Sequence, residues 1–360
     1  MTKRIYNFSA GPAVLPAEVL EKAQSELLSI GETGMSVMEV SHRSKHFAPF
    51  LERAESGIRE LLAVPENYRV LFLQGGASLQ FSMIPMNFLK TGADYVVTGA
   101  WGEKAVREAR KCGPVNVVYS TKETGYRSVP SQEELHFSAD ADYVHYCSNE
   151  TIDGVEFKYD LDGEGAPVVC DASSNILSKP IEIEKYALLY AGAQKNIGPS
   201  GVTLVIIRDD LVEKAPKDQF AMLDYRNFAA HSSMPNTPNT WGIYLTSLVC
   251  DWLKAKGGVE AMAQINEEKA RLLYDAIDRS DGFYRAHAAR EARSLMNVTF
   301  RLPSEELEEK FCREAAQEGM DGLRGHRSVG GIRASIYNAF PKEGVERLVE
   351  FMRDFTDRNG

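Results

Sequence analysis

The chain has 360 residues, of which 44% are hydrophobic and 26% are charged, and its 51 acidic against 41 basic residues give a net charge of −10. This length predicts two domains, because single domains typically run to about 100–200 residues. The acidic balance argues against a general nucleic-acid or anionic-membrane binder, which needs a basic face, but it allows an anionic substrate held by a few arginines.

The five cysteines are widely spaced and include no C-x-x-C pair, which argues against a disulfide framework or a structural zinc site. We therefore expect no metal. The N-terminus lacks the apolar core of a signal peptide, and no apolar stretch reaches the roughly 18 residues that a membrane helix needs. We expect a cytoplasmic protein that binds neither membrane nor nucleic acid.

Two helices are expected at the beginning of the chain. Pro16–Ile30 has apolar residues at helical spacing. Pro49–Leu62 has the same periodicity, with its proline in the first turn, where the missing N–H costs little.

Short apolar runs, each ending in a turn, then follow between about residues 65 and 210. Most are continuous and not alternating, which is typical of strands buried on both faces. Intervening stretches such as Gly102–Lys111 can form helices, so the pattern predicts an α/β fold with a mostly parallel central sheet flanked by helices. Two or three connections are too short for a full helix, which leaves room for one antiparallel strand. The runs are Arg69–Leu73, Asp94–Thr98, Val115–Tyr119, Tyr143–Cys147, Pro167–Cys170, Tyr186–Tyr190 and Val202–Arg208.

The pattern changes to α+β near the C-terminus. One helix there, Ser304–Glu318, begins with a good N-cap and carries negative charge in its first turn, where the helix dipole favours it. We expect an N-terminal segment over residues 1–15, a large domain over 16–257 and a smaller α+β domain over 258–360. The other expected elements are helices at Tyr244–Lys254, Gly258–Asp278 and Lys342–Arg358, and strands at Leu295–Leu302 and Gly331–Ile336.

Ligands of open α/β sheets bind beyond the carboxyl ends of the strands, so the residues after each run are the candidate site. After Leu73 comes Gln74-Gly75-Gly76-Ala77-Ser78, which opens a helix-like stretch. Glycines at a helix N-terminus suit a phosphate, because free N–H groups and the positive end of the helix dipole meet there. The alternative is a plain tight turn.

Two further candidates follow the next strands. Trp101 lies just past a strand end, where its indole can stack on an aromatic cofactor, or else belongs to the core. Thr151 lies in Ser148–Gly154, an unusually polar stretch after a buried run. Its hydroxyl can bond a ring substituent, and the alternative is a solvated loop, which the stretch taken alone favours.

Asp171 ends a fully apolar strand, where an unpaired carboxylate is costly to bury. A protonated ring nitrogen would pair with it. The alternative is a helix N-cap, for which aspartate is among the best residues.

Lys195 lies between small residues and a Gly198-Pro199 turn, directly before another apolar strand. Burial lowers the pKa of a lysine and makes it a Schiff-base nucleophile. The alternative is an exposed lysine in a turn. A phosphate cup, a stacking ring, a hydroxyl, a carboxylate and an amine at one sheet edge are together the groups that pyridoxal phosphate requires.

The sequence also resembles a known family, the phosphoserine aminotransferases, within the class V, fold-type I group of pyridoxal-phosphate enzymes. The resemblance covers nearly the whole chain. The most specific segments are Asn149-Glu150-Thr151-Ile152-Asp153-Gly154 and Ala191-Gly192-Ala193-Gln194-Lys195-Asn196. The others are Asn7–Pro12, Ser41–Ser44, Gln74–Gly76, Asp171–Ser174, Asn236–Pro238 and Gly331–Ser335.

The resemblance implies a role for each matching residue. Lys195 forms the Schiff base, Asp171 pairs with the pyridinium nitrogen, Trp101 stacks on the ring and Thr151 contacts its hydroxyl side. The residues implied to hold the cofactor phosphate are Gly76, Ala77 and Gln194, with Asn236 and Thr237 from a neighbouring subunit. The residues implied to bind the substrate carboxylate and phosphate are His42, Arg43, His326, Arg327 and Arg333.

The resemblance further implies a homodimer with shared active sites. The implied reaction moves the amino group of glutamate to 3-phosphohydroxypyruvate, giving 2-oxoglutarate and phosphoserine, in serine biosynthesis. Substrates of the 4-phosphohydroxythreonine type, from vitamin B6 synthesis, stay open. One small departure is Asn239, where many members carry a second proline, which puts the shape of that loop in doubt.

Other functions predict other residues. A different class V enzyme, such as an alanine–glyoxylate aminotransferase, would share the cofactor site, whereas a cysteine desulfurase needs a mobile cysteine near it. A protein that only carries the cofactor would not need both Lys195 and Asp171. A nucleotide-binding module is disfavoured because the chain has neither a G-x-G-x-x-G nor a G-x-x-x-x-G-K-[ST] motif.

Overall fold

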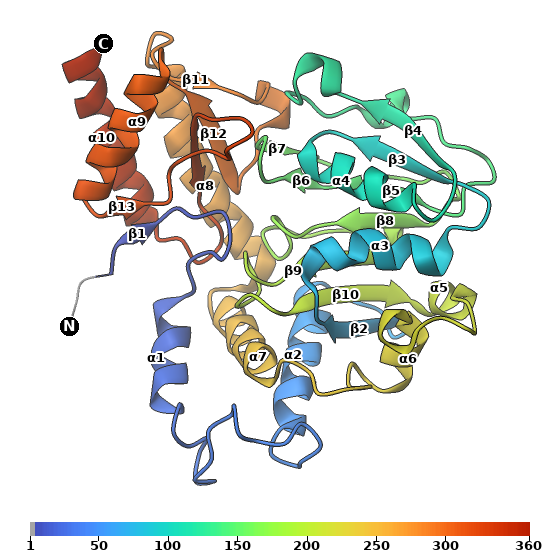
Figure 1. Cartoon of the computed structure of the whole chain (residues 1–360). Coiled ribbons are helices and arrows are strands. Elements are labelled where there is room, and N and C mark those ends of the chain that lie inside the picture. Colours follow the sequence, from blue (N-terminus) through green and yellow to red (C-terminus); the bar gives the residue numbers. More distant parts are fainter. Residues whose placement is uncertain (1–3) are drawn as a thin grey trace.

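A seven-stranded sheet forms the centre of the molecule in the computed structural model, which describes residues 4–360 (Figure 1). Its strand order is β2-β10-β9-β8-β5-β3-β4. The strands are β2 (Tyr68–Leu73), β3 (Ala93–Val97), β4 (Val115–Ser120), β5 (Val144–Cys147), β8 (Val168–Asp171), β9 (Tyr186–Gly192) and β10 (Thr203–Arg208).

Strand β10 runs antiparallel to both of its neighbours, β2 and β9, whereas the other neighbouring strands pair in parallel. This confirms the expected α/β class with a mostly parallel sheet, and all seven expected strand runs are present. The connection from β5 to β8 contains no helix. It holds a short hairpin of β6 (Asn149–Glu150) and β7 (Val155–Glu156).

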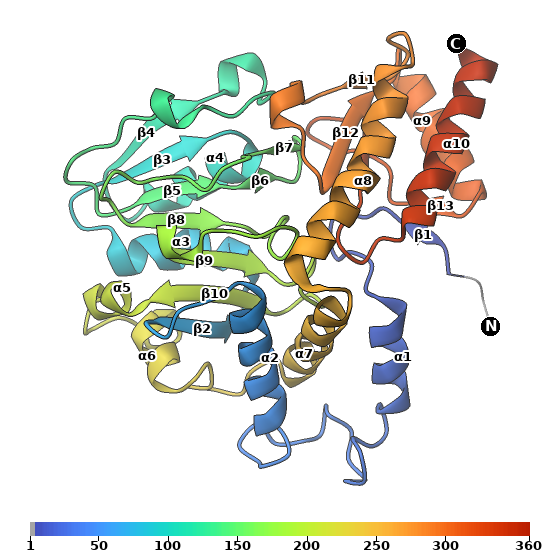
Figure 2. The ribbon, with the colours of Figure 1, turned by 180° about the vertical axis from the view of Figure 1, so that it is seen from behind.

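Both faces of the sheet are buried under helices, which explains the continuous apolar runs. In β2, Val70 and Phe72 pack into one core, whereas the alternating Leu71 and Leu73 pack into the other. The first core includes helices α2 (Ala48–Leu61) and α7 (Thr240–Ala255), and the second includes α3 (Gly76–Phe88) and α4 (Ala100–Ala109). The two helix layers lie on opposite sides of the sheet in Figures 1 and 2.

A second, smaller unit lies beside one end of the large sheet (Figure 2). Its three-stranded antiparallel sheet has the order β11-β12-β14 and packs with the C-terminal helices. The N-terminal strand β1 pairs in parallel with β13, and Phe8 is fully buried in the same core. The elements are β1 (Tyr6–Asn7), α8 (Gly258–Asp278), β11 (Arg285–Ala286), β12 (Asn297–Arg301), α9 (Glu305–Gln317), β13 (Met320–Asp321), β14 (Ile332–Ser335) and α10 (Lys342–Asn359).

Two helix predictions have wrong ends. Helix α1 (Ala17–Ser25) stops five residues before the expected Ile30, because the chain turns there and Leu28 is 86% exposed and not in a core. Helix α7 begins four residues before the expected Tyr244. The side chain of Asn239 caps it by accepting from the N–H of Gly242 at 2.9 Å, so asparagine serves at a position where the family often has proline.

The other helices expected from the sequence are present, with ends within a few residues of the predicted ones. In α9, the Ser304 hydroxyl accepts from the N–H of Leu307 at 3.3 Å, as an N-cap should. Two short helices that precede α7 were not predicted, namely α5 (Asp209–Lys214) and α6 (Tyr225–Ala230). Within residues 4–360, no helix is both long and apolar enough to cross a membrane, and all five cysteines carry free thiols.

Candidate active site

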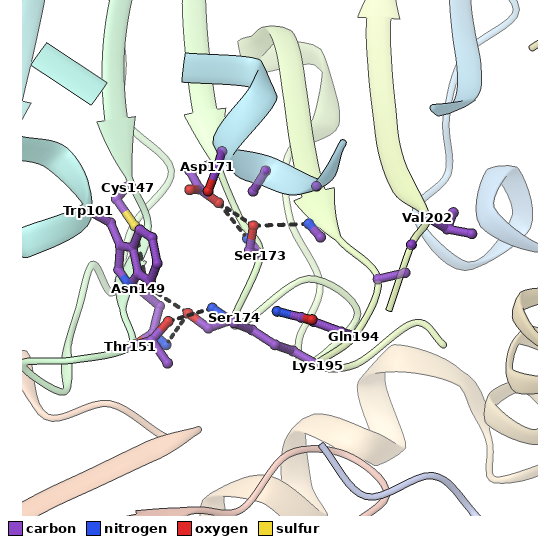
Figure 3. A pocket seen from close by; sticks show the side chains of 16 residues that line it. Trp101, Cys147, Asn149, Thr151, Asp171, Ser173, Ser174, Gln194, Lys195 and Val202 are labelled. Atoms are coloured by element: carbon purple, nitrogen blue, oxygen red, sulfur yellow. Dashed lines mark hydrogen bonds between the residues drawn. The ribbon is translucent and has the colours of Figure 1, made fainter. Parts of the chain in front are cut away.

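A cavity of about 630 Å³, including its open mouth, lies at the carboxyl ends of β3, β5, β8 and β9. Figure 3 shows side chains from several separate chain segments, among them Trp101, Thr151 and Lys195, around this cavity. Its size is within the range of pockets that hold small ligands. The lining includes Gly76, Ala77, Ser78, Trp101, Cys147, Asn149, Thr151, Asp171, Ser173, Ser174, Gly192, Gln194 and Lys195.

Lys195 reaches into the cavity from the β9–β10 connection. Its Nζ donates a hydrogen bond to Oγ1 of Thr151 at 2.6 Å (Figure 3). Burial lowers the pKa of Lys195, against the opposing effect of the nearby Asp171 carboxylate. The lysine is therefore not an exposed turn residue, and its amine is easier to deprotonate than that of a surface lysine.

The loop that carries Lys195 is tied down on both sides. Asn196, the next residue, donates from Nδ2 to the Ile176 carbonyl at 3.0 Å and accepts at Oδ1 from the Asn338 N–H at 3.0 Å. Gly198 lies so close to helix α7 that a Cβ there would meet the Thr246 hydroxyl at 2.9 Å. These contacts restrict where the Lys195 amine can lie.

Asp171 is the last residue of β8 and is 4% exposed. Its Oδ1 accepts from the N–H of Ser173 at 2.9 Å and from the hydroxyl of Ser173 at 2.5 Å. Within residues 4–360, no hydrogen bond reaches Oδ2. Residues 173–177 form turns and, in the part of the chain that the structure describes, no helix follows Asp171 directly, so the helix-cap interpretation is wrong. Burial raises the pKa of Asp171, and the Lys195 amine opposes that rise.

The glycine-rich turn after β2 is more than a plain turn, because it opens the 13-residue helix α3. Gly75 and Gly76 have φ angles of +89° and +68°, which favour glycine. No acidic side chain lies in the first turn of α3. Gly76 and Ala77, at the N-terminus of α3, line the cavity. The free N–H groups of this helix end can therefore bind an anion there.

Trp101 stands in the first turn of α4 and both packs against the core and lines the cavity. The Nζ of Lys195 lies 5.8 Å from the centroid of the indole. The indole Nε1 is buried and has no hydrogen-bond partner within the described part of the chain. The core and stacking interpretations of this residue are therefore compatible.

The substrate-binding candidates divide into two sets. Arg333, on β14, reaches the cavity edge, where its Nη1 donates to the Thr151 carbonyl at 3.3 Å. His326 lies on the preceding loop and hydrogen bonds to Ser328 at 2.6 Å. Burial and the positive charges of Arg333, Lys104 and Arg327 lower the pKa of His326. Arg333, Lys104 and Arg327 therefore lie near His326.

None of the substrate-binding candidates is among the residues that line the cavity, and neither are the cofactor-phosphate candidates Asn236 and Thr237. Arg43 is exposed and donates from Nε to Nε2 of His42 at 3.3 Å. Asn236 and Thr237 are also exposed, and the Thr237 carbonyl accepts from the Gln74 side chain at 3.0 Å. The structure does not bring these four residues to Lys195.

Several residues near the cavity had no role in the sequence reading. Ser173 orients Asp171, and its position two residues after a buried aspartate is a usable pattern for such a turn. The Lys104 amine lies 3.7 Å from the centroid of the Trp101 ring, three residues along the same helix. Glu150 and Asp153 are both buried next to α4.

The fold and the cavity match known proteins over the whole chain. The sequence model of the class-V aminotransferases matches residues 5–348. The chain is 54% identical to the phosphoserine aminotransferase of Lysinibacillus sphaericus, with 100% of both chains covered. The chain belongs to the phosphoserine aminotransferase family of class-V aminotransferases. It is therefore a pyridoxal-phosphate-dependent aminotransferase, as the sequence resemblance predicted.

Solved structures of phosphoserine aminotransferases agree with this assignment. The enzyme from Bacillus circulans subsp. alkalophilus is 50% identical and superposes with a TM-score of 0.98 over 100% of both chains. The pyridoxal-phosphate-bound enzyme from Trichomonas vaginalis is 42% identical, with a TM-score of 0.92 over 97% of this chain and 100% of that one.

Relatives with other activities share the fold alone. An alanine–glyoxylate aminotransferase from Nostoc has a TM-score of 0.80 at 17% identity, over 99% of this chain and 96% of that one. Cys147 is the cysteine that lines the cavity, but it ends strand β5 and burial raises its pKa well above the ordinary value. A buried thiol on a strand is unlike the mobile nucleophile of a desulfurase.

Proposed function

We propose that the chain transfers the amino group of glutamate to 3-phosphohydroxypyruvate, giving 2-oxoglutarate and phosphoserine, as a step of serine biosynthesis. The observation that carries the proposal is the hydrogen bond of 2.6 Å between Lys195 and Thr151, in one cavity with Asp171. We also propose the division into residues 1–15, 16–257 and 258–360 as domain boundaries.

The residues of the cavity fit pyridoxal phosphate. Asp171 offers a buried carboxylate whose Oδ2 accepts no hydrogen bond from residues 4–360, and a protonated ring nitrogen would satisfy it. The N-terminus of α3, with Gly76 and Ala77, suits the phosphate, together with Gln194. Trp101 offers a flat face to the ring, and Thr151 offers a hydroxyl to its oxygen.

Pyridoxal phosphate supplies an aldehyde that bonds to amines and a ring that takes up electrons from the α-carbon of a substrate. Lys195 carries the amine that would bond to it. With a substrate amine in its place, the Nζ of Lys195 would be the base in the cavity that could accept the proton of the substrate α-carbon. A base placed in this way contributes roughly 10²–10⁴-fold to the rate. Asp171 would hold the proton on the ring nitrogen, which its negative charge favours.

Both substrates carry an α-carboxylate and a second anionic group. Arg333 is placed for the carboxylate, since its guanidinium lies at the cavity edge and its Nε is buried without a hydrogen-bond partner in the described part of the chain. His326 and Arg327 are candidates for the distal phosphate or γ-carboxylate. His42 and Arg43 would complete that site from a second subunit.

The proposed assembly is a homodimer with shared active sites. In its support, Asn236 and Thr237 do not line their own chain's cavity, and the family resemblance implies that they hold the cofactor phosphate from a neighbouring subunit. Leu28 and Met38 lie in the same segment as His42 and are 86% and 58% exposed. Large exposed apolar side chains of this kind are common at protein interfaces.

The experiment that tests the proposal is a half-reaction. The purified holoenzyme is mixed separately with phosphoserine, glutamate, serine or alanine, and the cofactor absorbance is followed. We expect rapid bleaching by phosphoserine and glutamate but not by serine or alanine. Equal bleaching by serine or alanine would contradict the proposed substrate, and no bleaching by any of them would contradict the aminotransfer itself.

A further inference from the structure

Glu150 is a buried carboxylate that the proposed chemistry does not use. It lies on β6, is 0% exposed, and follows the end of strand β5 by three residues. Its Oε2 accepts from the N–H of Trp101 at 2.9 Å, and its Oε1 accepts from the N–H of Gly102 at 2.8 Å. Both carboxylate oxygens therefore bind the first turn of helix α4.

Asp153 binds the N–H group of Ala100, the residue before the two that Glu150 binds. Its Oδ2 accepts from the N–H of Ala100 at 3.1 Å. Two carboxylates from one loop thus bind three successive N–H groups at the start of α4, the turn that carries Trp101. Helix N-terminal N–H groups have no partner within the helix, so the loop satisfies them from outside.

Glycine at position 99 makes this approach possible. A Cβ on Gly99 would lie 2.4 Å from Cδ of Glu150 and 2.7 Å from Oδ2 of Asp153. These distances are too short for real contacts, so any other residue would push the carboxylates away. The usual local cap by a serine or aspartate side chain is absent because Gly99 takes the N-cap position.

Burying two carboxyl groups costs more free energy than capping α4 requires. Burial and the nearby Asp153 charge raise the pKa of Glu150 to about 8, against the two N–H groups that lower it. Burial also raises the pKa of Asp153 to about 6. A local cap would stabilise α4 without burying two carboxyl groups side by side. The carboxylates therefore achieve something that a local cap would not.

The additional effect is that one loop connects Trp101 with Lys195. Glu150 directly precedes Thr151, whose hydroxyl accepts from Lys195. The loop thus holds Trp101, because the Glu150 carboxylate binds the backbone N–H of Trp101. The same loop holds Lys195, because the Thr151 hydroxyl accepts from the Lys195 amine. A shift of the loop would move both groups together.

We propose that Glu150, assisted by Asp153, is a positioning residue that fixes the Trp101 indole relative to Thr151 and Lys195, and so sets the stacking of the cofactor ring. This inference rests on the proposed cofactor site. Glu150 does not line the cavity and acts through Trp101 and the loop.

The test compares two buried glutamates of the same hairpin. Glu150→Gln keeps the side-chain size but places an amide NH₂ against a backbone N–H. The matched control is Glu156→Gln on β7. Glu156 is also 0% exposed, but it binds Lys179 at 3.0 Å and Lys158 at 3.2 Å and does not line the cavity. Asp153→Asn provides a second, milder variant.

Three properties are measured on each holoenzyme: the dissociation constant for pyridoxal phosphate, the circular dichroism of the bound cofactor, and the thermal midpoint. We expect Glu150→Gln to weaken pyridoxal-phosphate binding about tenfold and to change the cofactor dichroism. Asp153→Asn should change both in the same direction but less. Glu156→Gln should lower the thermal midpoint and leave the cofactor signals as in the wild type.

Two results would overturn the inference. One is a wild-type cofactor affinity and dichroism in both Glu150→Gln and Asp153→Asn. The other is an equal change in Glu156→Gln, which would indicate general loosening of the hairpin. Should Glu150→Gln not fold, Asp153→Asn against Glu156→Gln decides in the same way. A wild-type protein that binds no pyridoxal phosphate would instead refute the proposed function.

Discussion

The two sides of the active site are built differently. The side proposed to hold the cofactor is formed by buried strand ends whose side chains already bind one another, as Lys195 does to Thr151 and Asp171 does to Ser173. The side proposed to hold the distal anion of the substrate is formed by loops whose cations, such as Arg43 and Arg327, are exposed. The first side is therefore held by internal hydrogen bonds, whereas the exposed side chains of the second side are freer to move.

This difference indicates how the two ligands are handled. A cofactor that stays bound benefits from rigid groups that need no reordering when it binds. A substrate that must enter and leave can be met by loops that are less constrained. Changes on the buried side should therefore affect the chemistry and the cofactor, and changes on the exposed side should affect substrate affinity.

The largest effect is expected from Lys195→Ala. Without the amine, the chain loses both the bond to the cofactor and the base for the α-proton, so turnover should be abolished. The measurements are glutamate-dependent amino transfer and the colour of the bound cofactor. Lys122→Ala, on an exposed lysine paired with Glu103, is the control and should behave as the wild type. Substantial activity in Lys195→Ala would refute the assignment.

Asp171→Ala should come next. The variant should keep some cofactor but lose roughly 10²-fold or more in kcat, because the ring nitrogen loses the charge that stabilises its protonated form. Steady-state kinetics and cofactor content after gel filtration measure both effects. Asp142→Asn serves as the control, because Asp142 binds the backbone N–H groups of residues 90–92 away from the cavity. A near-wild-type kcat in Asp171→Ala would mean that another group serves the ring nitrogen.

A smaller effect, confined to substrate affinity, is expected from Arg327→Ala. Loss of one charge-assisted contact to the phosphate should raise the KM for phosphoserine about tenfold with little change in the cofactor spectrum. Arg324→Ala, on the same loop but paired with Glu309 at 3.0 Å, should leave the KM unchanged. A fall in kcat without a change in KM would contradict the division between the two sides.

The smallest expected effect is the activity recovered when two impaired variants are mixed. This experiment tests whether the active site is shared between subunits. If Thr237 serves the partner's cofactor, a Lys195→Ala chain and a Thr237→Ala chain form mixed dimers with one intact site. Random assortment then restores roughly a quarter of the wild-type activity. A mixture of Lys195→Ala with Asp171→Ala should restore nothing, because both residues belong to one chain's site. Equal recovery in both mixtures would argue against the shared site.

The sequence predicted the large sheet well because its strands are buried on both faces and read as continuous apolar runs. It predicted α1 too long, because Leu27 and Leu28 fit the helical spacing although they lie outside the core. It missed the two-residue strands, such as β1, because strands of that length have no periodicity to detect. The roles of Glu150 and Asp153 also escaped it, since their partners are backbone N–H groups about 50 residues away.

The sequence by itself determined the fold class, the family and the sheet edge at which the cavity lies, because strands that run in parallel bring their carboxyl ends to one edge of the sheet. Only the tertiary structure decided between the open alternatives at each residue. It showed that Asp171 caps no helix, that Lys195 is held by Thr151, and that Arg43 and Thr237 lie outside their own chain's cavity. Burial and hydrogen-bond partners depend on contacts between distant segments, and local patterns do not encode them.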